Sequence, residues 1–382
     1  MSDAPIPLAR PDLGAREEEL VLEVMRSGRL SLGPMLERFE RGFASWLGAD
    51  GAVAVSNGTA ALHLAVRALG WGRGDEVVTS PFSFVASANC LLYEDAVPVF
   101  CDIDPVTLNI DVDAAAAACG SRTSGLLPVH IFGYPCDMVA VERLAQPHGL
   151  GIVEDACEAL GAVDAEGIKV GTRGHPAAFG FYANKQLTTA EGGMLTARDP
   201  AVRERARSER NQGRGQDMDW LGHDRLGFNY RLSDVAAAIG VAQLERVEEL
   251  LAERGRVAAS YAERLAGIEG LDLPCSDRDQ ARRSWFVYVV QLPDGVDRDG
   301  LIKALGERGI ASKAYLPCIH LQPFYRERFG YRGGEFPVAE RVAARSLALP
   351  FFTGMTEAQV DRVCEPLREL VAVGDMPTGV VR

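Results

Sequence analysis

Hydrophobic positions between residues 34 and 200 follow two alternating patterns. Short runs of apolar and β-branched residues alternate with segments whose apolar positions recur at helical spacing. This alternation predicts an α/β fold, in which helices cover both faces of a sheet. The pattern predicts helices over 59–69 and 138–146, and strands over 52–55, 76–79, 97–102, 125–130, 152–154, 178–182 and 193–196.

A different pattern begins at Ser233, a favourable helix N-cap. Apolar residues near helical spacing predict one long helix from there to about Leu265. After it, SWFVYVVQL and ASKAYLP have the composition of strands, and DRDGLIKALGERGI that of a helix. A chain of 382 residues exceeds the usual size of a single core. We therefore expect a large domain over 1–250, which includes the start of the long helix, and a smaller C-terminal α+β domain over 251–382.

The composition limits the partners of the protein. A net charge of -13 argues against nucleic acid and anionic membranes, because both need clustered cations. Neither a signal peptide nor an apolar run of transmembrane length is evident, which predicts a cytoplasmic protein. The eight cysteines form no C-x-x-C pair and no zinc-like cluster, so we expect reduced thiols and no metal site.

The first motif with chemical potential is VAVSNGTAALHLA, where a strand ends and a helix begins at once. Free N–H groups and the positive end of the helix dipole would face a phosphate there. Gly58 would allow close approach, and the Thr59 hydroxyl could donate a hydrogen bond. The same residues are also ordinary at a structural strand-to-helix turn.

Two further motifs follow along the chain. GIVEDACEALGA places Asp155 at the carboxyl end of a strand, where open α/β sheets bind ligands and where an anion would keep a pyridinium nitrogen protonated. A helix N-cap is the alternative for Asp155. In AFGFYANKQLTTAEGGMLTA, Lys185 follows an apolar strand, and a shielded lysine can attack an aldehyde. Most lysines, however, are merely exposed to solvent.

Together these motifs resemble the DegT/DnrJ/EryC1/StrS family of sugar aminotransferases. The resemblance implies the pyridoxal-phosphate-dependent transferase fold type I: a large domain with a mostly parallel mixed sheet between helices, and a smaller C-terminal α+β domain. The matching segments, in order, are SGRLSLGPMLERFE, SNGTAALHLA, PFSFVASANCLLYEDAVPVFCDID, LLPVHIFGYPCDM, VEDACEALGA, FYANKQLTTAEGGM, GFNYRLSDVAAAIGVAQLERV, YLPCIHLQPFY and LALPFF.

The resemblance also implies roles for particular residues. Lys185 would form the Schiff base with pyridoxal 5'-phosphate and act as general acid and base, while Asp155 would pair with the pyridine nitrogen. Phe84 would stack on the cofactor face, unless it is a core phenylalanine. Glu158 falls where the family carries a polar side chain near the cofactor ring.

The phosphate end of the cofactor involves a second subunit in this family. Gly58 and Thr59 would bind the phosphate, and Asn229 would reach it from the neighbouring subunit of a homodimer. Without the resemblance, Asn229 would be a turn residue. Many relatives carry a serine five residues before the lysine, whereas this chain has Gly180, so a hydroxyl donor is missing from its phosphate cradle.

The implied reaction takes an amino group from glutamate, leaves pyridoxamine phosphate, and passes the group to a nucleotide-linked keto sugar. A dTDP-4-keto-6-deoxyhexose is our first candidate, with 3-keto sugars, UDP or GDP carriers and amino-cyclitol ketones as alternatives. Arg231, Tyr315 and His320 are possible substrate contacts, or else packing or surface residues.

Three other functions compete with this one. Dehydration of a keto sugar normally uses histidine in place of the lysine, so Lys185 argues against it. A catalytically silent regulator could keep the same fold. A nicotinamide dehydrogenase is suggested by the glycines at 70, 72 and 74, but these precede a strand-like run instead of following a strand and opening a helix.

Overall fold

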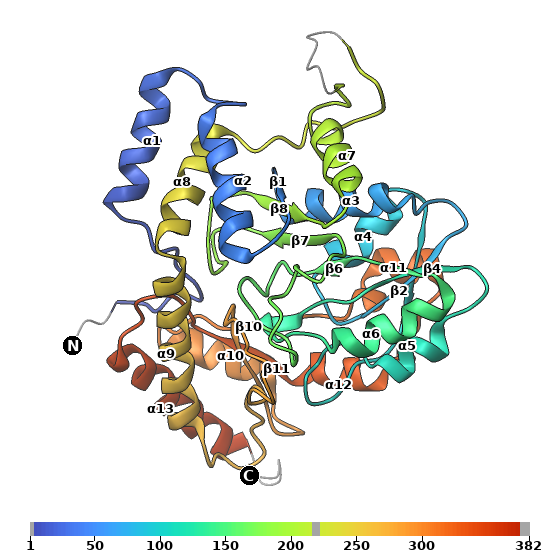
Figure 1. Cartoon of the computed structure of the whole chain (residues 1–382). Coiled ribbons are helices and arrows are strands. Elements are labelled where there is room, and N and C mark those ends of the chain that lie inside the picture. The colour runs from blue at the N-terminus through green and yellow to red at the C-terminus, as the bar shows by residue number, and fades with distance from the viewer. Residues whose placement is uncertain (1–3, 216–221, 375–382) are drawn as a thin grey trace.

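The computed structural model describes residues 4–215 and 222–374. Its larger part is a central sheet with helices on both faces, and its C-terminal part contains a second, smaller sheet (Figure 1).

The central sheet forms from two groups of strands, ordered β3-β2-β4-β5 and β1-β8-β7-β6. The two groups form one sheet because β5 and β6 follow one another within residues 151–155. Along this segment Val153 N donates to Leu126 O, and Asp155 N donates to Pro128 O. All neighbouring strands are parallel except those beside β8, so the expected mostly parallel mixed sheet is confirmed. The strands are β1 (Ala52–Val55), β2 (Glu76–Thr79), β3 (Val97–Phe100), β4 (Thr123–Leu127), β5 (Gly151–Ile152), β6 (Glu154–Asp155), β7 (Ala177–Gly180) and β8 (Gly193–Thr196).

Alternate side chains of these strands enter different cores, as a pleated strand requires. Val53 and Val55 pack with α3 and α4. Ala52 and Ala54 pack on the other face with α2 and with α8 (Asp234–Glu245). Val78 packs with α5 and α6. The helices of this part are α1 (Ala15–Ser27), α2 (Pro34–Leu47), α3 (Gly58–Leu69), α4 (Ala86–Leu92), α5 (Val112–Ala118), α6 (Met138–Ala145) and α7 (Pro200–Arg210), with short 3-10 turns η1 (Ile131–Gly133) and η2 (Gln146–His148).

The prediction of one continuous helix from Ser233 to about Leu265 is wrong. The segment forms two helices, α8 (Asp234–Glu245) and α9 (Val247–Leu265). Ser233 does cap α8, accepting a hydrogen bond from Ala236 N. The break falls at Arg246, whose backbone leaves the helical region at φ -126° and ψ 20°. Its guanidinium binds Asp12 and Glu17 near the N-terminus. Figure 1 shows α8 and α9 following one another from the central sheet to the C-terminal part.

The C-terminal part has its own antiparallel sheet, ordered β10-β11-β9. The strand expected in ASKAYLP is only two residues long, because the chain beyond it turns towards the central sheet, where Ile319 N donates to Pro81 O. The core beside this sheet includes Ile6 from the N-terminus and Val257 from α9, and a domain boundary after residue 250 stays a prediction. The elements are β9 (Tyr288–Gln291), α10 (Arg298–Glu307), β10 (Lys313–Ala314), η3 (Ile319–Leu321), α11 (Pro323–Phe329), α12 (Pro337–Arg345), β11 (Ser346–Leu349) and α13 (Glu357–Gly374).

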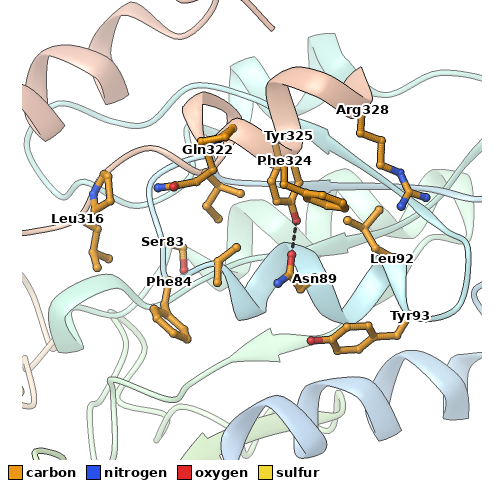
Figure 2. Close-up of a pocket in the computed structure, with 14 residues that line it drawn as sticks. Ser83, Phe84, Asn89, Leu92, Tyr93, Leu316, Gln322, Phe324, Tyr325 and Arg328 are labelled. Carbon is orange, nitrogen blue, oxygen red and sulfur yellow. Dashed lines mark hydrogen bonds between the residues drawn. The ribbon is translucent and has the colours of Figure 1, made fainter. Parts of the chain in front are cut away.

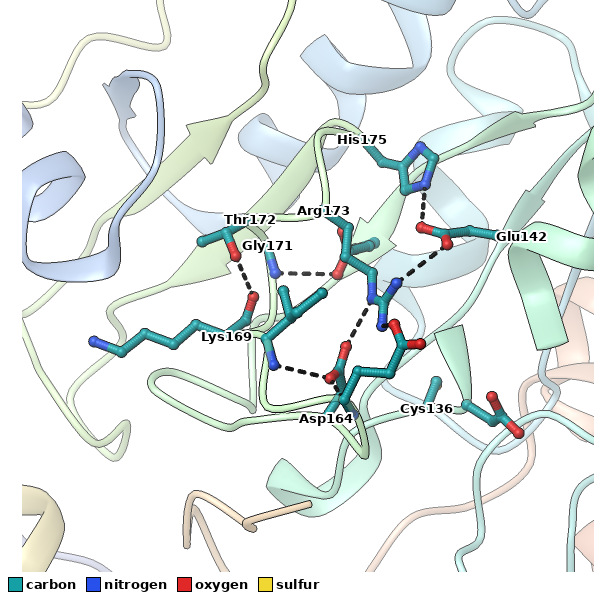
Figure 3. Close-up of polar contacts among 12 residues, drawn as sticks. Cys136, Glu142, Asp164, Lys169, Gly171, Thr172, Arg173 and His175 are labelled. Carbon is teal, nitrogen blue, oxygen red and sulfur yellow. Dashed lines mark hydrogen bonds and ion pairs between the residues drawn. The ribbon is translucent and has the colours of Figure 1, made fainter. Parts of the chain in front are cut away.

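The connection between β6 and β7 is held by a buried arginine (Figure 3). The guanidinium of Arg173 donates to Asp164 at 2.7 Å, to Glu142 of α6 at 3.1 Å and to Glu166 at 2.7 Å. Arg173 thereby ties this connection to α6. Because the guanidinium is largely buried, these charge-assisted bonds are stronger than surface ion pairs.

Two expectations about the chain as a whole can be compared with the structure. All eight cysteines are free thiols, five of them buried, as expected. Within residues 4–215 and 222–374, no helix combines the length and the apolar character needed to span a membrane.

Asp234 offers a test of the packing between α2 and α8. Its buried carboxylate accepts hydrogen bonds from the N–H groups of Gly33, Met35 and Leu36 at the start of α2. Asp234→Ala is expected to lower the free energy of unfolding by about 2 kcal/mol, because these donors lose their acceptor. Thermal unfolding measures the effect, with exposed Asp113→Ala as the control. Equal unfolding midpoints for the two variants would contradict this account.

Candidate active site

A cavity of about 760 Å³ opens at the carboxyl ends of β6 and β7, beside the first turn of α3. This is the edge where parallel strands of open α/β sheets bind ligands. Residues predicted from distant parts of the sequence meet in its wall: Gly58, Thr59, Phe84, Asp155, Glu158, Gly180, Lys185 and Tyr315.

Asp155 is fixed by two hydrogen bonds. Its Oδ2 accepts from the Ser87 hydroxyl at 2.6 Å, and its Oδ1 accepts from Cys157 N at 3.1 Å. The Ser87 hydroxyl also contacts that of Ser83, which lines the cavity. Asp155 is 5% exposed, so its carboxylate is oriented and shielded from water. An oriented buried anion suits a protonated ring nitrogen.

Lys185 lines the cavity, and its side chain is 14% exposed. Its Nζ is 3.7 Å from Glu158 Oε1 and 3.8 Å from the centre of the Phe286 ring. Glu158 Oε2 accepts from Phe132 N at 2.9 Å. Burial raises the pKa of Glu158 above its ordinary value, and the charge of Lys185 opposes this shift. Glu158 therefore keeps its proton to a higher pH than an exposed glutamate does.

The turn before α3 has the features expected of a phosphate site. Asn57 caps the helix by accepting a hydrogen bond from Ala60 N at 2.8 Å. Gly58 and Thr59, whose N–H groups precede that of Ala60 in the first turn, line the cavity. A Cβ on Gly58 would lie 2.8 Å from Cys157 Sγ and 3.2 Å from Gly180 Cα, so only glycine allows this close packing. At Gly180, by contrast, the nearest atom to an added Cβ would be 3.5 Å away. A serine would fit there, and the missing hydroxyl is not a steric necessity.

Several residues at or beside the cavity were not among the predicted site residues. Ser87, which binds Asp155, lies within the PFSFVASANC motif, and Asn184 of the wall directly precedes Lys185, so both had a local signal. Tyr230 of the wall also had one, because it follows Asn229 in the GFNYRLSD motif. Phe286 had no such signal, because only the fold brings it to the wall.

The candidate substrate contacts separate in the structure. Tyr315 lines the cavity, and burial together with the charge of Glu158 raises its pKa well above the ordinary value, so its hydroxyl stays protonated. Arg231 lies outside the wall and donates to Asn211 Oδ1 at 3.0 Å. Asn229 is exposed and also outside the wall.

His320 requires a correction, because the structure does not bring it to the cavity. Its ring is fully buried, with Nε2 3.0 Å from Glu340 Oε1 and with Phe336 packed edge-on against it. Glu335 completes a group that could in principle hold a metal. Both carboxylates, however, accept backbone N–H groups of residues 332–336, so they already stabilise that loop. His320 is therefore a packing residue, which was the alternative to a substrate contact.

The sequence pattern of the DegT/DnrJ/EryC1/StrS aminotransferase family matches residues 11–368. The chain belongs to this family. The expected fold type I and the expected enzyme class, a pyridoxal-phosphate-dependent sugar aminotransferase, are thereby confirmed.

Individual members of the family are similar over nearly the whole chain. GDP-perosamine synthase of Caulobacter vibrioides is 39% identical, with 97% of this chain and 100% of that protein covered. The structure of S. venezuelae DesV in complex with a ketimine intermediate is 35% identical, with a TM-score of 0.90 and coverage of 96% and 99%. DesI in the presence of its TDP-sugar product is 33% identical, with a TM-score of 0.88 and coverage of 98% and 94%.

The raised pKa of Glu158 gives a spectroscopic prediction. In the protein without cofactor, the infrared C=O stretch of a carboxylic acid should persist above pH 4.5, the ordinary value, and should vanish in Glu158→Gln. Glu191→Gln, which removes an exposed carboxylate of the same cavity, should keep the signal.

The same shift affects stability, because native Glu158 binds its proton at higher pH than the unfolded chain does. The wild type should therefore lose stability relative to Glu158→Gln as pH rises from 4.5 through the raised pKa. Parallel pH profiles of the unfolding midpoint would rule out a raised pKa.

Proposed function

We propose that this protein transfers an amino group from glutamate to a nucleotide-linked keto-deoxysugar, with a dTDP-4-keto-6-deoxyhexose as the first candidate acceptor. The observation that carries the proposal is the meeting of Asp155, Glu158 and Lys185 in one shielded cavity beside the first turn of α3. This arrangement provides an anion, a proton acceptor and an amine around one space, as amino transfer requires.

The residues of the cavity fit pyridoxal 5'-phosphate. Asp155, held by Ser87 and Cys157 N, would face the ring nitrogen, and Gly58 and Thr59 would hold the phosphate. When bound, the cofactor supplies an aldehyde that carries the amino group and a ring that withdraws electrons from the carbon losing a proton.

Lys185 is the group that would move protons in this site. Its Nζ lies 3.7 Å from Glu158 Oε1 and against the face of the Phe286 ring. In this position Nζ can accept a proton from one carbon of the reacting molecule and return it to another, because few water molecules compete. Glu158 would compensate each change of charge at Nζ by gaining or losing a proton of its own.

Phe84 is assigned to the cofactor face because of its exposure. Its side chain is 61% exposed at the mouth of the cavity, which excludes the alternative of a core phenylalanine. An exposed ring becomes useful when a flat molecule enters and stacks on it. Tyr315, with its protonated hydroxyl, would donate a hydrogen bond to cofactor or sugar from the other wall.

The acceptor is proposed from the relatives. The names of GDP-perosamine synthase and of the DesI complex specify a GDP sugar and a TDP sugar respectively. We therefore expect a nucleoside-diphosphate sugar, with the 4-keto compound on dTDP tested first and 3-keto sugars and amino-cyclitol ketones as alternatives.

The assay offers glutamate with a panel of dTDP-, UDP- and GDP-linked 3-keto and 4-keto sugars. The product with the proposed acceptor should carry nitrogen at carbon 4, identified by mass spectrometry and NMR. Lys185→Ala should lose activity by at least about a thousandfold, because the amine is removed. Formation of 2-oxoglutarate without amination of any sugar would refute the acceptor but not the aminotransferase. The absence of both reactions would refute the proposed donor as well as the acceptor.

We further propose that the active form is a homodimer that shares its sites. Exposed aromatic residues gather beside the cavity in an apolar groove of about 800 Å³, where Figure 2 shows Phe84, Tyr93 and Phe324. Exposed apolar surface of this kind favours association. Asn229 is exposed and does not line its own cavity, so it is available to a neighbouring subunit.

A mixing experiment tests the shared site. Lys185→Ala and Asn229→Ala should each be nearly inactive at limiting cofactor. Equal mixing after subunit exchange should restore about a quarter of wild-type activity, because half of the dimers then hold one site with both residues intact. Failure to recover activity, with mixed dimers demonstrated by native mass spectrometry, would place Asn229 in the site of its own subunit.

A further inference from the structure

The segment over 228–231 brings Tyr230 to the wall of the catalytic cavity and packs against α3. The rings of Phe228 and Tyr230 stack on one another, with their centres 4.9 Å apart. Both rings also contact His63 of α3, at 4.9 and 5.9 Å between ring centres. His63 is buried, so a core residue of α3 supports two alternate residues of this segment.

His63 also holds the segment by a directional hydrogen bond. Its Nε2 is 2.8 Å from Glu94 Oε1, and its Nδ1 is 3.1 Å from the Tyr230 hydroxyl. Because a carboxylate only accepts, Nε2 carries the proton, and Nδ1 accepts from the hydroxyl of Tyr230. Burial lowers the pKa of His63, although the bond to Glu94 opposes this shift, so the ring stays neutral as this arrangement requires.

The acceptor of the His63 proton is itself fixed by an arginine. Arg67, one turn further along α3, donates to Glu94 Oε2 at 2.7 Å and to buried Glu209 of α7 at 2.6 Å. The carbonyl of Glu209 in turn accepts from Phe228 N at 2.6 Å. Figure 1 shows α7 beside α3. The contacts therefore lead from α3 through α7 back to the same segment, which restricts it on two sides.

Asn229 lies on the other face of this segment. The segment is extended between two neighbours, because Ser56 N donates to Tyr230 O and Tyr230 N donates to Arg210 O. Alternate side chains of an extended segment point to opposite sides. The two rings face α3, so the side chain of Asn229 is directed away from α3 and is exposed. The packing against His63 therefore decides where Asn229 points.

We propose that His63 is a positioning residue for the neighbouring active site: it fixes Tyr230 and so holds Asn229 in the orientation from which it reaches the cofactor of the other subunit. This role rests on the proposed homodimer with shared sites. His63 lies outside the wall of the catalytic cavity, so it acts through the segment and not by touching cofactor or sugar. Its effect falls on the site of the other subunit.

Cofactor affinity tests this role, because pyridoxal 5'-phosphate attached to Lys185 absorbs visible light and can be titrated without any sugar. His63→Leu removes both hydrogen bonds of the ring and should weaken cofactor binding to the homodimer by about tenfold. Tyr230→Phe removes only the hydroxyl and should weaken it by a similar factor. The double variant should be no weaker than either, because both changes act through one bond. Leu64→Ala, in the core side of the same helix, is the control, which should lower the unfolding midpoint and keep wild-type affinity.

Mixed dimers decide in which subunit His63 acts. After subunit exchange between Lys185→Ala and His63→Leu, only the His63→Leu chains can attach the cofactor. In a mixed dimer such a chain faces the unaltered segment of the other chain. With equal mixing, about half of the attachment sites should therefore bind with wild-type affinity, and the rest should stay weak.

Three results would overturn the role of His63. These are wild-type affinity in both His63→Leu and Tyr230→Phe, additive losses in the double variant, or weak binding at every site of the mixture, which would place the effect within one subunit. If His63→Leu does not fold, Tyr230→Phe takes its place in the mixture.

A parallel mixture of Lys185→Ala and Asn229→Ala separates this failure from failure of the shared site. Recovery with Asn229→Ala but not with His63→Leu refutes only the positioning role. Recovery with neither variant refutes both the role and the shared site. Recovery with His63→Leu alone refutes Asn229 as the residue that is positioned. None of these titrations contains a keto sugar, so their outcome is independent of the proposed acceptor.

Discussion

The ion pair between Lys185 and Glu158 is the interaction on which the chemistry of the site depends. The two groups are 3.7 Å apart and largely shielded, with Phe286 against the amine. A buried charge without a partner is costly, so each group stabilises the charged form of the other. A change of charge on Nζ therefore alters the electrostatic environment of Glu158. The second carboxylate, Asp155, is held in place by its bonds to Ser87 and Cys157 N.

The sheet places these groups by a simple constraint. Residues 151–155 bond to β4 along their first part and to β7 along their last, and so join both halves of the sheet. The strand ends at Asp155, beside the end of β7 and the start of α3. Because Gly58 lacks a side chain, α3 approaches β7 closely enough for one molecule to touch both. Arg173 secures the connection between these strands from outside.

The C-terminal part contributes to two cavities with different character. In the catalytic cavity it supplies Phe286 and Tyr315, which shield the amine and keep a protonated hydroxyl nearby. In a second cavity, beside the loop over 105–108, it supplies Arg283 and Gln291 to the lining. Both cavities lie where the two parts of the chain meet, because only there can side chains from both reach the same space.

The sequence by itself determined the local elements and the residues inside continuous motifs. Strands β1, β2 and β8 begin and end as predicted, and Asp155 and Lys185 stand in motifs that combine a buried strand with a polar end. The tertiary structure alone decided the break at Arg246, the burial of His320 and the arrival of Phe286 at the cavity. The physical reason is that periodicity reports which face of an element is apolar, whereas these features depend on contacts with residues distant in the chain. Arg246 meets Asp12 and Glu17, and His320 meets Glu340, only after the fold has formed.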